Sequence, residues 1–179
     1  MRPSLVFEIE NVPLFKSQLL QWAKQFSKVC YLNSNVEAIS VRQKFQYSKY
    51  DLLVAADAVE ELTLNAGTAF EQLKNFYDSK KDWLFGYFGY DLKNETEKLV
   101  SENEDRMGFP EFHFFQPRYV FILIGQQIRV EFLKEYSTEE EINFLMEQIK
   151  ILSFEKERIS SSKPNIQSIL KGWEKENKN

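Results

Sequence analysis

The chain has little of the residue types on which covalent, metal and phosphate chemistry usually depend. Its 179 residues include one cysteine, Cys30, and one histidine, His113, with six glycines and five prolines. A single cysteine excludes an internal disulfide, and its apolar neighbours predict a buried thiol in a reducing compartment, so we expect a cytoplasmic protein. The 16 Phe and 8 Tyr favour packed elements with short connections over disorder.

One-sided charge and long apolar runs are also lacking. The 23 basic and 27 acidic residues are interspersed and give a net charge of −4, which is not the electrostatic pattern of a nucleic-acid-binding protein. No stretch approaches the roughly 18 uncharged apolar residues of a membrane span. The first eight residues have no apolar core of the kind found in signal peptides. We therefore expect no nucleic acid and no membrane among the partners.

Self-contained catalytic machinery is not indicated. His113 lies in an aromatic run far along the chain from Cys30, which favours ordinary packing over a Cys-His pair. Gly86 and Gly89 lie inside an aromatic strand and lack the following Lys-Ser or Lys-Thr of a phosphate loop. The carboxylates of residues 93–106 alternate with basic residues and lack the spacing of a calcium loop, so a solvated loop is favoured. We predict no catalytic residue, no metal site and no cofactor in this chain.

Hydrophobic periodicity predicts alternating strands and amphipathic helices. Strands are expected at residues 5–10, 29–33, 50–56, 83–90, 119–124 and 127–133, the last two joined as a hairpin through Gly125. Helices are expected after Pro13, after a capping Thr68, and after two overlapping capping boxes at residues 137–141. Pro110 and Pro117 bracket residues 112–115, which predicts an irregular or edge segment there.

Composition divides the chain into a globular part and a polar end. We predict one domain over residues 1–153, and a polar linker over residues 154–179 that leads toward a further domain; the same composition equally fits a frayed tail. The alternating strands and helices indicate an α+β fold.

Residues 83–92, Trp-Leu-Phe-Gly-Tyr-Phe-Gly-Tyr-Asp-Leu, are the most unusual segment. Two glycines in a strand leave gaps where something flat could approach the backbone, or else they mark a bulge or a tight crossing of strands. The Gly-aromatic-Phe-Gly-Tyr-Asp pattern resembles the amino-terminal domain shared by anthranilate synthase component I and aminodeoxychorismate synthase component I. Three more segments resemble that family in the same order: residues 31–34, Tyr-Leu-Asn-Ser; residues 47–55; and Phe-Pro-Glu at 109–111.

The resemblance implies a fold and a ligand site. The fold would be α+β, with antiparallel sheets packed in two layers and flanking helices. The ligand would be tryptophan, with Ser34 bonding its polar groups. The residues that the resemblance assigns to this pocket are Ser34, Tyr47, Lys49, Tyr50, Phe88, Gly89, Tyr90 and Asp91. Taken one by one, the aromatic residues also fit ordinary core packing, and Ser34 also fits a turn or cap.

The resemblance also implies a pathway. The anthranilate synthases usually carry Glu before the serine, whereas this chain has Asn33, which favours the aminobenzoate branch. Component I of that branch is a transferase that converts chorismate and ammonia from glutamine to 4-amino-4-deoxychorismate in folate biosynthesis. Its chorismate and Mg²⁺ sites lie in a carboxyl-terminal domain outside this chain, so we expect the chain alone to be inactive. Expected partners are that domain, the glutamine amidotransferase component II, and tryptophan, with self-association through exposed apolar surface.

Two alternatives remain open at this stage. The first is the corresponding domain of anthranilate synthase component I, in which tryptophan would be a feedback inhibitor. The second is a stand-alone module that binds an aromatic amino acid. The residue at position 33 and the presence or absence of a catalytic partner distinguish them.

Overall fold

The computed structural model describes residues 2–34, 49–64, 67–96 and 108–152. The strands are β1 (Ser4–Glu8), β2 (Val29–Asn33), β3 (Leu52–Leu64), β4 (Phe85–Phe88), β5 (Phe112–Ile124) and β6 (Gln127–Phe132). The helices are α1 (Val12–Ala23), α2 (Ala69–Lys80), α3 (Lys93–Thr96) and α4 (Glu139–Ile151), and a 3₁₀ turn covers Tyr90–Leu92. These strands form one six-stranded antiparallel sheet in the order β1-β6-β5-β3-β2, with β4 also paired to β5, so the α+β class is confirmed.

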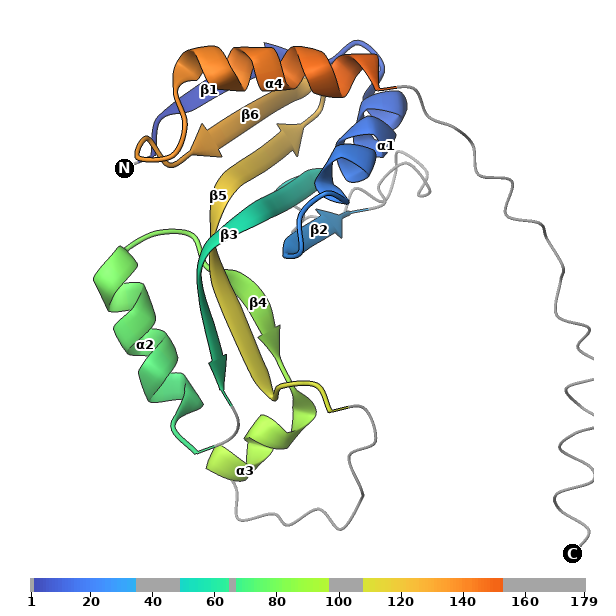
Figure 1. Ribbon diagram of the computed structural model, residues 1–179. Helices are drawn as coiled ribbons and strands as arrows, with labels where there is room; N and C mark the ends of the chain where they lie inside the picture. Colours follow the sequence, from blue (N-terminus) through green and yellow to red (C-terminus); the bar gives the residue numbers. More distant parts are fainter. Residues whose placement is uncertain (1, 35–48, 65–66, 97–107, 153–179) are drawn as a thin grey trace, which may run out of the picture.

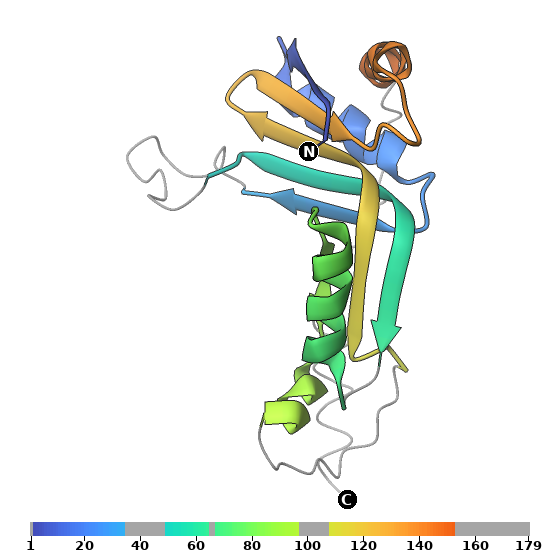
Figure 2. The same ribbon diagram turned by 90° about the vertical axis from the view of Figure 1, so that its left-hand side faces the viewer.

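The sheet is sharply bent where its two longest strands change neighbours (Figures 1 and 2). β3 and β5 pair along their whole length, from Leu52 opposite Leu123 to Leu64 opposite Phe112. On its other side β5 pairs first with β4 and then, beyond the bend, with β6. We call the part with β1, β6 and β2 the upper arm, and the part with β4 the lower arm. Both arms therefore share one continuous pair of strands, where two packed sheet layers were expected.

Pro117 lies at the bend, inside a central strand, where proline is normally excluded because it has no N–H for the ladder. It falls between the end of the β4 pairing at Phe115 and the start of the β6 pairing at Tyr119, and the register with β3 shifts between Ala58 and Glu60. Pro117 therefore lies outside the β4 and β6 ladders, and it is opposite Ala58 of β3 at the point where that ladder is irregular. The prediction that residues 112–115 are irregular or an edge was wrong, because they begin the central strand β5.

Helices α1 and α4 cover one face of the upper arm (Figure 1). Their apolar stripes pack on alternate residues of β3, β5 and β6, as the helical and strand periodicities require. Thr138 and Glu141 form the capping box that begins α4, which confirms the second of the two expected boxes. Gln18 on α1 donates to the carbonyls of Lys150 and Leu152, at 2.7 and 3.1 Å, and so joins the two helices. The fully buried members of this core include Leu19, Val54, Phe121, Val130, Ile142 and Met146.

Helix α2 lies beside the lower arm (Figure 1), over a smaller cluster that contains Ala69, Leu92 and Phe112. Thr68 is the N-cap residue, as expected, but its side chain makes no capping hydrogen bond. The carboxylate of Glu95 instead accepts from the N–H groups of Gly67 and Ala69, at 2.5 and 2.9 Å. The Ala69 N–H is the main reason that the pKa of Glu95 lies below its ordinary value. In the part of the chain described, no helix is long and apolar enough to cross a membrane.

The glycines of the unusual segment bring β4 against the backbone of β5. A Cβ at Gly86 would lie 2.0 Å from the carbonyl oxygen of His113, and one at Gly89 would lie 2.8 Å from that of Glu111. The Gly89 N–H also donates to the Glu111 carbonyl at 2.5 Å. The space beside these glycines is therefore filled by the neighbouring chain. Of the interpretations that the sequence allows, this is the tight crossing of strands and not a gap for a ligand.

We predict that Gly86→Ala lowers the free energy of unfolding by about 1–3 kcal/mol, because the new methyl group overpacks the β4–β5 pair. Gly89→Ala is the matched comparison, and we expect a smaller loss because its Cβ meets less severe overlap. Urea denaturation followed by circular dichroism measures both. Equal stability of Gly86→Ala and the unchanged chain would contradict the close approach.

Candidate functional site

The first group of residues predicted for the tryptophan pocket lies where β2 ends and β3 begins. The Oγ of Ser34 donates to the carbonyl of Asp51 at 3.0 Å, and the Ser34 N–H donates to the same oxygen at 3.2 Å. Lys49 precedes β3, and its Nζ is 5.2 Å from the centroid of the Tyr50 ring. Tyr50 packs against the apolar cluster on the face of the upper arm opposite α1 and α4. Ser34 and Tyr50 therefore lie at one end of the β2–β3 pair.

The second group lies in the lower arm, at the other end of β5. Phe88 pairs with Phe112, and its ring contacts Phe70, Phe112 and Phe114 with centroids 4.9–5.7 Å apart. The Tyr90 side chain is 82% exposed. Because Leu52 is opposite Leu123 at the far end, the two groups are separated by roughly 35 Å along the strand.

The structure therefore does not bring the predicted residues into one pocket. Ser34, Lys49 and Tyr50 share one place, and Phe88, Gly89 and Tyr90 share another. Tyr47 and the side chain of Asp91 lie outside the described residues.

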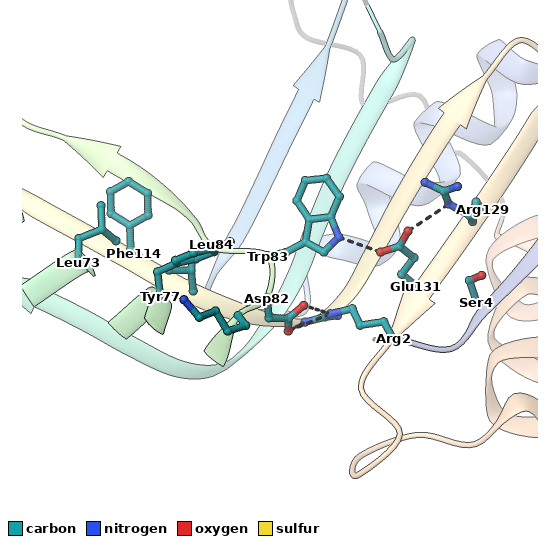
Figure 3. Close-up of a pocket in the computed structure, with 11 residues that line it drawn as sticks. Arg2, Ser4, Leu73, Tyr77, Asp82, Trp83, Leu84, Phe114, Arg129 and Glu131 are labelled. Carbon is teal, nitrogen blue, oxygen red and sulfur yellow. Dashed lines mark hydrogen bonds and ion pairs between the residues drawn. The ribbon is translucent and has the colours of Figure 1, made fainter. Parts of the chain in front are cut away.

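A cavity of about 720 Å³ lies where the α2–β4 connection meets the edge of the upper arm (Figure 3). Its apolar wall is formed by residues of α2, of the segment before β4, and of β5. These residues are Leu73, Tyr77, Trp83, Leu84 and Phe114. Its polar wall is formed by β6, by the amino-terminal segment, and by the two residues that follow α2. These residues are Arg2, Ser4, Lys81, Asp82, Arg129 and Glu131. The sequence singled out none of these residues as a binding residue, and Trp83 and Leu84 were noted only as the start of the aromatic segment at residues 83–92.

An ion pair between Arg2 and Asp82 closes the base of this cavity. Arg2 Nε is 2.8 Å from Asp82 Oδ1, and the two side chains are only 5% and 13% exposed. The Arg2 guanidinium also donates to the carbonyls of Pro117 and Arg118, the residues of the bend. Gln116 donates to the second oxygen of Asp82 at 2.7 Å. The pair thus joins the amino-terminal segment, the residues after α2 and the bend of β5.

The pKa of Asp82 reflects this arrangement. Burial by itself raises the pKa of the carboxyl group, but hydrogen bonds from Arg2, Gln116 and the Trp83 backbone N–H together bring it below its ordinary value. Asp82 is therefore ionised at neutral pH and holds the Arg2 guanidinium in place.

A second polar contact fixes the indole of Trp83 (Figure 3). Its Nε1 donates to Glu131 Oε2 at 2.8 Å, and the other oxygen of Glu131 lies 3.1 Å from Arg129 Nε. The Trp83 ring also stacks on Phe85, with centroids 5.7 Å apart. The indole is therefore held from both its polar edge and one face.

Cys30 and His113 line another cavity, of about 600 Å³, although they are far apart in the sequence. Burial raises the pKa of the Cys30 thiol, while burial and the charge of Lys28 lower the pKa of His113. Both groups are therefore favoured in their neutral forms, which disfavours thiolate chemistry. The His113 ring is instead held by a 2.9 Å contact between its Nδ1 and Thr63 Oγ1. Over the described ranges, no group of three or more His, Cys, Asp or Glu side chains could hold a metal ion.

We predict that Arg2→Met destabilises the fold by about 3–5 kcal/mol, because it leaves the Asp82 carboxylate buried without its cation. The double variant Arg2→Met, Asp82→Leu should recover part of that loss, since both charges are then removed. Arg129→Met is the control, because its ion pair is half-exposed and should contribute less than about 1 kcal/mol. Urea denaturation of these proteins together with the single variant Asp82→Leu gives the coupling energy, and additive losses would contradict a structural pair.

The same pair predicts how stability depends on pH. Because the pKa of Asp82 is lower in the folded than in the unfolded state, its contribution is fully present above the unfolded pKa of about 3.9. That contribution is lost as the pH falls through the folded pKa. We expect the Asp82→Asn variant to lose less stability than the unchanged chain between neutral pH and the acid range. Parallel acid profiles in thermal denaturation would show that Asp82 is not the linked group.

A scan against protein-family models finds no match, and a search of curated proteins finds none.

Proposed function

We propose that this chain is the non-catalytic amino-terminal domain of a chorismate-utilising synthase of the aminodeoxychorismate synthase component I type. The observation that carries the proposal is the pairing in space of the four segments that resemble that family. Residues 31–34 lie against residues 50–55 as β2 and β3, with Ser34 bonded to Asp51. Gly89 is bonded to Glu111, which joins the glycine segment to residues 109–111. Segments that resemble one family in sequence thus contact one another in two pairs.

The proposed role is to complete and support the enzyme rather than to carry its chemistry. The catalytic step, replacement of the 4-hydroxyl of chorismate by ammonia, would take place in the chorismate-binding domain with its Mg²⁺. Component II would supply ammonia from glutamine. The neutral Cys30 and His113 fit a supporting role, because neither is favoured in a reactive form. The implied two-layer fold would require strands from outside the described residues to pack on the bent sheet.

A tryptophan site, in this proposal, uses the group at the β2–β3 end. Ser34, Lys49 and Tyr50 lie there together, with the Ser34 hydroxyl oriented by Asp51. The Phe88 group is too far along β5 to contact the same ligand, and its rings already pack on α2 and β5. The second wall of the site would then come from the catalytic domain.

Position 33 supports the aminobenzoate branch. Asn33 Oδ1 accepts a hydrogen bond from the buried Lys16 at 3.3 Å. The anthranilate branch carries Glu at the corresponding place, and a Glu here would form a charged pair with Lys16 instead. The neutral amide of Asn33 is therefore the feature that favours the aminobenzoate branch over the anthranilate branch.

The proposal is tested by reconstitution. The purified chain is added to the chorismate-binding domain and the glutaminase of the same organism, with chorismate and glutamine as substrates. We expect the rate of formation of 4-amino-4-deoxychorismate to increase by at least about tenfold, which corresponds to a fall of about 1.4 kcal/mol in the activation free energy. The chain with Arg2→Met, whose fold should be weakened, is the matched control.

The alternatives give different results in the same assay. Stimulation only of an anthranilate-forming catalytic domain, with inhibition by tryptophan, would assign the chain to the other branch. No complex in sedimentation and no stimulation, together with tryptophan binding by the chain alone in calorimetry, would replace the proposal by a stand-alone binding module.

A further inference from the structure

The cavity of Figure 3 carries an inference that is independent of the proposed function. We propose that it is a binding site for a small organic anion with a flat apolar body, namely an aryl carboxylate. The inference rests on a fixed aromatic wall, an arginine with unused donors opposite it, and the balance of charge between them. The site is distinct from the β2–β3 end, since none of Ser34, Lys49 and Tyr50 lines the cavity.

The flat body of the ligand would lie on the aromatic wall. Trp83 is held by its hydrogen bond to Glu131 and by its stack on Phe85, so its indole does not need to be ordered when a ligand binds. Tyr77 on α2 and Phe114 on β5 extend the same wall. Surfaces that are rigid before binding lose less conformational entropy on binding, and aromatic faces favour flat partners.

Arg129 is the anchor for the carboxylate. Its Nε faces Glu131, while its terminal amino groups have no partner among the described residues, and its side chain is 47% exposed. A guanidinium with two free N–H groups on one side matches the two oxygens of a carboxylate. Ser4 lies opposite Glu131 in the β1–β6 pair, which makes it the diagonal neighbour of Arg129 at about 7–8 Å. Its hydroxyl lines the cavity and can supply a further hydrogen bond.

The charges favour a ligand with a single negative charge. Three positive side chains, Arg2, Lys81 and Arg129, line the cavity with two negative ones, Asp82 and Glu131, and the charge of Lys81 is offset by Asp78, so a doubly charged ligand would leave more charge uncompensated than a singly charged one. The guanidinium of Arg2 is already bonded to Asp82 and to the carbonyls of the bend. Arg2 therefore forms the base of the site and does not bind the ligand. Lys81 is bound to Asp78 outside the cavity lining. A carboxylate is therefore a better match than a phosphate ester with two charges.

The size of the cavity fits a ligand of one or two rings. Its volume of about 720 Å³ is within the roughly 300–1,000 Å³ usual for small-molecule sites.

The test uses 2-naphthoate as the probe and 2-naphthamide as its uncharged counterpart. Binding is followed by ¹H–¹⁵N NMR of the full chain, with the indole N–H of Trp83 as the reporter. Trp22, which is buried between α1 and the sheet, is the internal control. We expect 2-naphthoate to shift the Trp83 signal in a saturable manner and leave that of Trp22 unchanged. The amide should bind at least about tenfold more weakly, because it lacks the charge that Arg129 recognises.

Two variants separate the site from its surroundings. Arg129→Gln keeps a polar, exposed side chain and should weaken 2-naphthoate binding by about tenfold or more. Lys24→Gln, at the exposed end of α1, removes the same charge outside the cavity lining and should have no effect. Equal binding of acid and amide, equal binding by Arg129→Gln, or shifts confined to Ser34 and Asp51 would each overturn the inference. No partner domain and no chorismate are present, so failure here is distinct from failure of the reconstitution.

Discussion

The buried pair of Arg2 and Asp82 is the interaction on which the two arms of the sheet depend. Its guanidinium contacts a side chain from the residues after α2 and backbone carbonyls from the bend of β5, so one group ties three segments that are distant in sequence. The net contribution of such a buried pair to the free energy of unfolding is small. Removal of one partner is nevertheless costly, because it leaves the other charge buried and unpaired. Other arrangements of the arms would leave Asp82 without its partners. The pair therefore specifies one angle between the arms.

That angle decides where binding can occur. β5 is a common spine that contacts different neighbours above and below Pro117, and any two side chains at its opposite ends are too distant to share a small ligand. The residues that the family resemblance assigned to one pocket therefore lie at two different ends of β5. The inner side of the bend, by contrast, brings Trp83 of the α2–β4 connection beside Glu131 and Arg129 of β6. A cavity there is a consequence of the bend.

Local signals in the sequence were sufficient for much of the fold. The strand at Val29–Asn33 has the predicted bounds, Gly125 takes the positive φ of 60° that its hairpin turn needs, and Thr138 caps α4 as expected. These features are decided by residues close to one another in the chain. The error at residues 112–115 has a physical cause. Two flanking prolines normally exclude a central strand, and nothing local shows that β5 changes partners at Pro117.

The candidate site could be predicted only in part. Two pairs of segments singled out by resemblance are in contact, but their separation along β5 follows from the bend, which no pattern shows. The cavity was missed because Arg2, Asp82 and Glu131 each look like ordinary surface charges in the sequence. A charged residue directly before Trp83, in an aromatic segment, is the only local signal that could have pointed to it. Its meaning depends on an arginine brought there by tertiary structure.

The position of β1 has a consequence for how the protein is made. β1 leaves the ribosome before the other strands described, yet its only partner in the described sheet is β6, with Ser4 opposite Glu131. Until β6 is synthesised, Leu5 and Phe7 have no sheet to cover them, and the edge of β1 is open to other chains. Closure of this strand is a late and non-local event, so its rate should be governed by chain topology more than by local propensity. A nascent chain stopped before residue 127 would be expected to need a chaperone to cover β1.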